Sequence, residues 1–281
     1  MNKWIIGARP RTLPAAVAPV LVATAYAGSN WSPLRALSAL LVSLSLQIGV
    51  NYANDYSDGI RGTDDSRIGP VRLTASGLAS AKSVRTAAFI AFIFAAVIGV
   101  TLAAATSWWI VLVGAGAINA AWSYTGGAKP YGYVGLGEIS VFIFFGIVAT
   151  VGSYYVQVEE LNLQIFIIAV PMGSLACAIL AINNLRDRAQ DKLVGKKTLA
   201  VRLGDTGARR LYIALLISAH LFAILTFKPA TALTLLAAPM TWKLARGVAG
   251  GVSGGDLIPY LARTGKLQLV FALLFALGLL L

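Results

Sequence analysis

The chain has 281 residues, of which 58% are hydrophobic and only 12% are charged. Soluble domains carry about a quarter charged residues, so this composition excludes a soluble protein and indicates an integral membrane protein. The single cysteine, Cys177, lies in an apolar run, which excludes both a disulfide and a cysteine metal site within one chain.

Nine stretches are apolar enough to be candidates for membrane-spanning helices, since a span needs about 20 mostly apolar residues. We therefore predict an all-α integral membrane protein with nine transmembrane helices in one bundle, forming a single domain over residues 1–281. The predicted spans are 12–28, 34–54, 83–104, 107–125, 134–154, 163–185, 210–227, 229–245 and 265–281. The eighth is the weakest, because Pro229 and Pro239 bracket it.

The net charge of +12 is explained by topology. If the N-terminus is cytoplasmic, every Lys and Arg except Arg35 and Lys228 falls on the inner side, as the preference for positive charge inside requires. This distribution predicts a multi-pass protein of the cell membrane and makes a nucleic-acid partner unnecessary.

Four of the eleven acidic residues appear where the second predicted span ends, in the stretch QIGVNYANDYSDGIRGTDD from Gln47 to Asp65. Residues three and four apart lie on one face of a helix, so helical spacing predicts that Asn51, Asp55 and Asp58 share a face. An acidic face at the mouth of a hydrophobic bundle is costly unless a cation occupies it.

A second acidic cluster, NNLRDRAQD from Asn183 to Asp191, follows the sixth predicted span. Asp187 and Asp191 are four residues apart, as on one helical face. Both clusters fall on the inner side, and each is followed by a basic loop, VRLTASG after the first and KKTLAVRLG after the second. This pattern indicates an internal repeat whose two acidic helix ends face each other across a central cavity.

Two facing carboxylate clusters with basic neighbours are typical of a metal-bridged diphosphate site. Mg²⁺ prefers oxygen ligands and usually binds through one or two carboxylates, waters and substrate phosphates. The expected substrate therefore has an anionic head at the cytoplasmic rim and a lipid tail. Two other interpretations are a solvated charged surface and an ion pathway of a transporter. A transporter is disfavoured because, apart from Glu138, the predicted spans carry no carboxylate near the midplane.

A third candidate element is the loop WSYTGGAKPYGYVGLGE between the fourth and fifth predicted spans. Its glycines allow close backbone approach, and it carries Tyr124, Lys129, Tyr131 and Tyr133. The tyrosines fit either a substrate site or an aromatic belt at the membrane interface. Lys129 is the only cation in this inner loop, so we expect it to pair with a phosphate or a carboxylate.

Taken together, these stretches resemble the UbiA superfamily of membrane prenyltransferases. The matching segments are ARPRTLPAAVAPV, NDYSDGIRGTDD followed by GPVRLTASG, YTGGAKPYGYVGLGE and NNLRDRAQDKLVGKKTLAVRLG, so the resemblance spans essentially the whole chain. It implies a nine-helix bundle around a central cavity with a lateral opening for the lipid tail. It also implies two aspartate-rich motifs that bind Mg²⁺ and a prenyl diphosphate.

The resemblance assigns roles residue by residue. It implies Mg²⁺ ligation by Asp55, Asp58, Asp187 and Asp191, with Asp64 as a further candidate, and it gives Lys129 and Tyr124 catalytic roles beside these four aspartates. The residues expected to bind diphosphate are Asn51, Asn54, Arg72, Lys129, Asn183, Asn184, Lys196 and Lys197. One departure is Gly62, which stands where many superfamily members have a further acid; Asp64 and Asp65 follow it.

The implied reaction is the transfer of a polyprenyl group to an aromatic acceptor. Mg²⁺ and basic residues stabilise the departing diphosphate, and the electron-rich ring attacks the allylic cation that remains. The resemblance is strongest to the branch that uses 1,4-dihydroxy-2-naphthoate, in which carbon dioxide is lost and demethylmenaquinone forms. Prenylation of 4-hydroxybenzoate or homogentisate is the alternative. The expected partners are these substrates and membrane lipid; the sequence does not indicate an oligomeric state.

Overall fold

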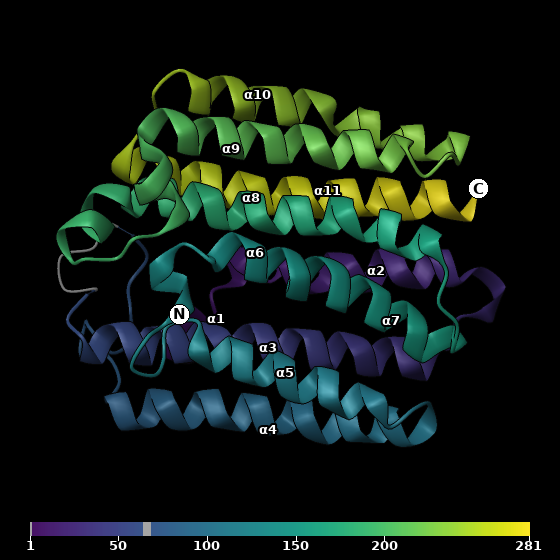
Figure 1. Ribbon diagram of the computed structural model, residues 1–281, viewed down its shortest axis with the longest axis horizontal. Helices are drawn as coiled ribbons and strands as arrows, with labels where there is room; N and C mark the ends of the chain where they lie inside the picture. The colour runs from purple at the N-terminus through teal and green to yellow at the C-terminus, as the bar shows by residue number, and fades with distance from the viewer. Residues whose placement is uncertain (1, 64–68) are drawn as a thin grey trace.

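The computed structural model describes residues 2–63 and 69–281, and throughout these ranges the regular structure is helical. The helices run roughly side by side in one bundle (Figure 1). In chain order the elements are α1 Lys3–Ala8, η1 Pro10–Thr12, α2 Pro14–Ala27, η2 Gly28–Asn30, α3 Pro33–Ile60, α4 Ala81–Ala105, α5 Trp109–Ser123, η3 Tyr131–Val134, α6 Gly137–Val141, η4 Phe142–Val148, α7 Ala149–Val158, α8 Leu163–Leu193, α9 Leu199–Ile224, η5 Pro229–Ala237, α10 Ala238–Ala249, η6 Gly254–Leu257 and α11 Ile258–Leu280.

Among the described residues, six helical segments are long and apolar enough to cross a membrane. A seventh span is possible if residues 3–12 and 14–30 are counted as one segment, bent by 53°. The remaining two predicted spans correspond to α5, which has 15 residues, and to η5 with α10, where a 3₁₀ segment precedes a short α-helix. Both regions are helical, but each falls short of a regular 18-residue helix. The multi-pass character is therefore clear, whereas a count of nine spans is not established.

The helix α8 lies at the centre of the bundle. Its apolar window is 78% buried, against 28% for α3, α4 and α9. Gly173 on α8 allows close packing against the continuous segment formed by α6, η4 and α7: a Cβ atom built on Gly146 of η4 would lie 2.6 Å from the Gly173 Cα. The backbones therefore touch here, which holds the middle of this segment against α8.

The chain turns sharply between α1 and α2. Arg9 adopts a left-handed conformation, with φ of 53°, and Pro10 follows it. The hydroxyl of Tyr52 on α3 donates a hydrogen bond to the Trp4 carbonyl oxygen at 2.7 Å, which ties α1 to α3. The turn thus places residues 8–12 against the middle of α3.

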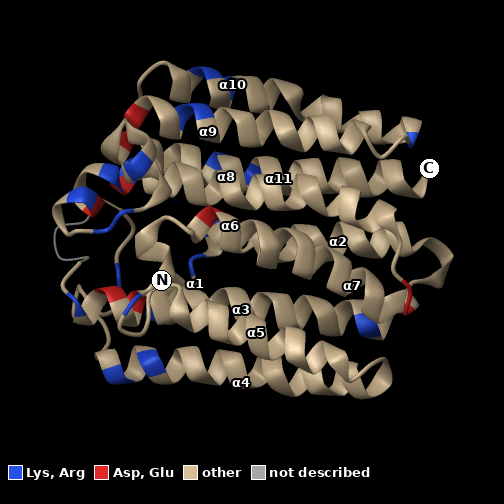
Figure 2. Ribbon diagram, in the orientation of Figure 1, with Lys and Arg blue, Asp and Glu red and all other residues tan. Residues whose placement is uncertain are grey.

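Charged residues gather mainly at one end of the bundle, the left end in Figure 2. The C-terminal ends of α3 and α8, which carry the two acidic motifs, both lie at this end (Figure 1). At the opposite end Arg35, near the start of α3, pairs with Glu159 at 2.7 Å. The fold therefore brings the two motifs, more than 120 residues apart in the chain, to one side of the molecule.

Candidate active site

A cavity of about 750 Å³ lies inside the bundle and reaches the end that carries the charges. Most of its wall is apolar, with contributions from α3, α4, α5, η4 and α7. At its polar end it is lined by side chains of both acidic motifs, namely Asn54, Asp58, Asn183, Asn184, Asp187 and Asp191. One continuous space therefore has a charged mouth and a hydrophobic interior.

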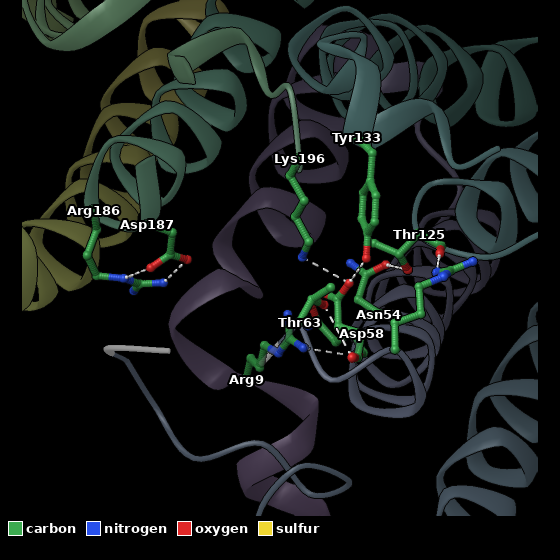
Figure 3. A network of polar contacts seen from close by, with 11 residues as sticks. Arg9, Asn54, Asp58, Thr63, Thr125, Tyr133, Arg186, Asp187 and Lys196 are labelled. Atoms are coloured by element: carbon green, nitrogen blue, oxygen red, sulfur yellow. Dashed lines mark hydrogen bonds and ion pairs between the residues drawn. The ribbon is translucent and has the colours of Figure 1, made fainter. Parts of the chain in front are cut away.

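Asp58 is the residue through which the first motif meets the rest of the site. Its Oδ1 accepts a hydrogen bond from the Tyr133 hydroxyl at 2.5 Å and another from the Lys196 ammonium group at 3.1 Å (Figure 3). All three residues line the cavity. Lys196 comes from the loop after α8, so this contact joins the segment behind the second motif to the first motif.

The surroundings of Asp58 keep its two partners protonated. Burial lowers the pKa of Lys196, but the negative charge of Asp58, with smaller contributions from Tyr133 and Asp191, raises that pKa by more, so it lies above its ordinary value. Burial raises the pKa of Tyr133, and the Asp58 carboxylate raises it further. Tyr133 therefore remains a hydrogen-bond donor and Lys196 a cation at neutral pH.

In the second motif Asp187 is paired with its neighbour Arg186. The guanidinium group donates two hydrogen bonds of 2.7 Å, one to each carboxylate oxygen, and a third to the Asn183 side-chain oxygen. Arg186 is 5% exposed and also lines the cavity. Such a bidentate pair fixes the plane of the carboxylate, as Figure 3 shows.

Asn54 and Asn184 are each held by a partner from the segment around the loop between α5 and α6. Asn54 accepts a hydrogen bond from Thr125 at 2.8 Å, and Asn184 donates one to the buried carboxylate of Glu138 at 3.0 Å. The same loop is tied to the end of α3 by Arg61, whose guanidinium donates to the Thr125 carbonyl oxygen and stacks near the Tyr133 ring. Both motif asparagines are thus fixed by this segment.

Asp55 is placed differently from Asp58. It is fully buried, and its two carboxylate oxygens accept hydrogen bonds from the Leu73 and Thr74 backbone amides, each at 2.8 Å. It does not line the cavity, whereas Arg72, next to these amides, does. The structure therefore separates Asp55 from the other motif carboxylates and gives it the geometry of a support for the Arg72 loop.

The other residues that were predicted in the site also differ in whether they line the cavity. Tyr124 lines the cavity, with its ring edge-on to Tyr131 at a centroid distance of 5.5 Å. Lys129 and Lys197 are exposed and do not line the cavity. Asp64 and Asp65 lie outside the described residues. Among the described residues, Lys196 therefore reaches Asp58 of the first motif, as one of the two lysines predicted in its loop, whereas Lys129, which was also predicted, does not line the cavity.

Two contributors to the site were not predicted as such. Arg186 was attributed to topology alone, and Tyr133 was left between a substrate site and a membrane-interface belt. The signal for Arg186 was its position directly before Asp187 in the second motif. The signal for Tyr133 was its place in a glycine-rich loop that also carries Tyr124.

The oxygen-rich end fits a magnesium ion in its donor chemistry. The donors are carboxylate and amide oxygens, which Mg²⁺ prefers. Among the described residues no three acidic, histidine or cysteine side chains are grouped closely enough to hold an ion alone. An ion at this end would therefore need water or substrate oxygens to complete its coordination shell, as is usual for Mg²⁺.

Comparison with known proteins agrees with this site. Residues 16–252 match the model of the UbiA prenyltransferase family. The chain is 48% identical over 278 residues to 1,4-dihydroxy-2-naphthoate octaprenyltransferase of Mycobacterium tuberculosis, covering 98% of this chain and 95% of that protein. It is 39% identical over 290 residues to the protein of the same name from Escherichia coli, covering 98% and 94%.

Solved structures share the fold at low sequence identity. A UbiA homolog from Archaeoglobus fulgidus, bound to GPP and Mg²⁺, superposes with a TM-score of 0.70 at 15% identity and covers 99% of both chains. A UbiA homolog from Aeropyrum pernix K1, in its apo form, gives a TM-score of 0.71 at 14% identity, covering 95% of this chain and 96% of that one. These likenesses concern the fold.

Proposed function

Because the chain belongs to the UbiA prenyltransferase family, we propose that it transfers a polyprenyl group from polyprenyl diphosphate to 1,4-dihydroxy-2-naphthoate. The bond between the prenyl carbon and the diphosphate oxygen breaks, and a new bond forms to the ring carbon that bears the carboxylate. Carbon dioxide and diphosphate leave, which gives demethylmenaquinone in its reduced, quinol form. The observation that carries this proposal is the single cavity that has both acidic motifs at its mouth and an apolar interior.

The mouth is suited to a diphosphate held through Mg²⁺. Asn54 and Asp58 on α3, with Asp187 and Asp191 on α8, supply the oxygen donors of the two motifs. Bound there, Mg²⁺ would neutralise the negative charge that develops on the departing diphosphate. The structure of the Archaeoglobus fulgidus homolog with GPP and Mg²⁺ supports this reading.

Two cations at the mouth are held by motif carboxylates. Lys196 pairs with Asp58, and Arg186 pairs with Asp187. Both cations line the cavity, so a diphosphate held there through Mg²⁺ would offer them phosphate oxygens as further partners in charge-assisted hydrogen bonds. We therefore assign diphosphate contacts to Lys196, Arg186 and Arg72, and none to the exposed Lys129 and Lys197.

The apolar wall protects the reacting carbon from water. Phe144, Phe145 and Val148 line the cavity. A dry cavity prevents water from trapping an allylic cation, and aromatic faces such as that of Tyr124 attract a cation electrostatically. The same wall provides room for the lipid tail of the donor.

The proposal also covers how the bundle is oriented in the membrane and how many times the chain crosses it. The charges at one end of the bundle (Figure 2) support a cytoplasmic mouth, since positive residues flank cytoplasmic ends. We propose nine membrane spans, of which α5 and the η5–α10 region are the two short ones. The nine spans form one domain over residues 1–281, and the protein lies in the cell membrane. The family match over residues 16–252 supports a single domain.

The direct test uses the purified protein in lipid nanodiscs. It is incubated with Mg²⁺, a labelled polyprenyl diphosphate and one acceptor at a time, and the products are separated by chromatography. We expect demethylmenaquinol with 1,4-dihydroxy-2-naphthoate. Prenylated 4-hydroxybenzoate as the only product would overturn the acceptor assignment, and absence of transfer to any aromatic acceptor would overturn the enzyme assignment.

A further inference from the structure

Two buried amides, Gln47 and Asn51, lie in the cavity wall, and the sequence predicted one of them, Asn51, to bind diphosphate. Gln47 and Asn51 lie one turn apart on α3, are 6% and 4% exposed, and both line the cavity. They are nearer the middle of the bundle than Asp58: Asn51 precedes it by seven residues, or about 10 Å of helix. The metal and diphosphate site is at the mouth, so these amides face the space beyond it.

The hydrogen bonds around Thr12 fix which way both amides point. Thr12 Oγ1 donates to the Arg9 carbonyl oxygen at 3.0 Å, which uses its only proton. With its proton donated there, it accepts from its other two neighbours, the Gln47 amide nitrogen at 3.1 Å and the Asn51 amide nitrogen at 3.2 Å. The Asn51 nitrogen also donates to the Ala8 carbonyl oxygen at 2.9 Å, and that oxygen can only accept. The orientation of each amide thus follows from its partners.

It follows that the side-chain oxygens of Gln47 and Asn51 are left for an occupant of the cavity. Among the described residues the side-chain hydrogen bonds of both amides use their nitrogens, and both side chains line the cavity. A diphosphate offers only acceptor oxygens, and a prenyl tail offers no polar group. What these oxygens require is a molecule with two hydrogen-bond donors.

We propose that Gln47 and Asn51 bind the aromatic acceptor by accepting hydrogen bonds from its two hydroxyl groups. The two hydroxyls of a 1,4-dihydroxy ring are separated by roughly one helical turn, about 5.4 Å, which is the spacing of residues four apart. Thr12 is a positioning residue, because it holds both amides with their oxygens outward. The inference rests on the proposed function and adds a site for a ring with hydroxyls at opposite positions, so it disfavours acceptors with one hydroxyl.

Gln47→Leu is the most direct test, because it keeps the approximate size of the side chain and removes its amide, including the oxygen, while leaving the Asn51 bond to the Ala8 carbonyl oxygen. We expect the KM for 1,4-dihydroxy-2-naphthoate to rise about tenfold, the effect of one lost hydrogen bond, with the KM for polyprenyl diphosphate and the Mg²⁺ requirement unchanged. In the wild type, the inhibition constant of 1-hydroxy-2-naphthoate should be higher than the dissociation constant of 1,4-dihydroxy-2-naphthoate. One of the two variants Gln47→Leu and Asn51→Leu should abolish that difference.

Thr12 and Gln157 provide the matched variants. Thr12→Val should also raise the acceptor KM, and Thr12→Ser, which keeps the hydroxyl, should restore it. Gln157 is likewise buried and bonded to a threonine, Thr24, at 3.0 Å, but does not line the cavity, so Gln157→Leu should leave the acceptor KM unchanged. An unchanged acceptor KM in folded Gln47→Leu, or a rise confined to polyprenyl diphosphate, would overturn the inference. If the wild type prenylates no aromatic acceptor, the proposed function has failed instead.

Discussion

Lys196, in the loop that follows α8, donates a hydrogen bond of 3.1 Å to the carboxylate of Asp58 near the end of α3. The two residues are separated by 138 positions in the chain, and both are at least nine-tenths buried. This contact connects the segments of the two acidic motifs. It also means that a buried cation is already in place where diphosphate would bind.

Replacement of Lys196 by Met should raise the KM for polyprenyl diphosphate, because the variant keeps the length of the side chain but lacks its charge. It should also change the dependence of stability on pH. The pKa of Lys196 is raised in the folded protein, so its stabilising effect is complete below the ordinary pKa of about 10.5 and is lost as the pH rises through the higher value. Thermal unfolding in detergent from about pH 9 to about pH 12 measures this loss, which should begin above the ordinary pKa of about 10.5. Equal slopes for Lys196→Met and the wild type would contradict it.

Asp55→Asn should destabilise the protein without altering its metal requirement. An asparagine cannot accept hydrogen bonds from the Leu73 and Thr74 amides with both of its side-chain heteroatoms, so one buried amide loses its partner, at a cost of about 1–3 kcal/mol. Denaturation measures that cost, and a titration of activity with Mg²⁺ measures the metal requirement. Asp58→Asn is the matched change and should raise the Mg²⁺ concentration needed. If Asp55→Asn raises it to the same extent, Asp55 is a metal ligand and not a support for the loop.

The close approach of two glycines predicts a third effect. Gly146→Ala would place a methyl group 2.6 Å from the Gly173 Cα, so α8 and η4 would have to move apart. We expect a loss of stability of about 1–3 kcal/mol, as for other overpacked sites. Gly152→Ala, six residues further along the same helical segment, is the control, since nothing lies within 4 Å of the added atom. Thermal unfolding should separate the two variants, and equal midpoints would argue against tight packing at Gly146.

The sequence predicted the helical membrane class from composition and the two motifs from the local spacing of their acidic residues. It did not separate Asp55 from Asp58. With about 100° of rotation per residue, Asp55 is only about 60° from Asp58 around the helix, and periodicity alone cannot decide which of them faces a cavity. The separation depends on the Leu73 and Thr74 amides, which come from a loop that folds back onto α3.

Loop residues were the least predictable part of the site. Lys129 was singled out as the one cation of its inner loop, but it is exposed, whereas Lys196 turns into the cavity. The direction of a loop side chain depends on backbone turns such as the left-handed conformation of Gly127, with φ of 74°, and Gly195, with φ of 78°. The contacts of Thr12 were similarly hidden, since they depend on the bend between α1 and α2.

Side chains from both motifs are proposed to bind one diphosphate through Mg²⁺. Equilibrium binding of a labelled prenyl diphosphate tests this proposal most directly. The wild type, Asp58→Ala and Asp187→Ala are compared in nanodiscs, with Mg²⁺ and with EDTA, after each variant has been shown to be folded. We predict Mg²⁺-dependent binding by the wild type and a loss of at least about tenfold in affinity for either variant, the scale of one lost charged contact. Unchanged affinity in either variant, or equal wild-type binding in EDTA, would contradict the claim.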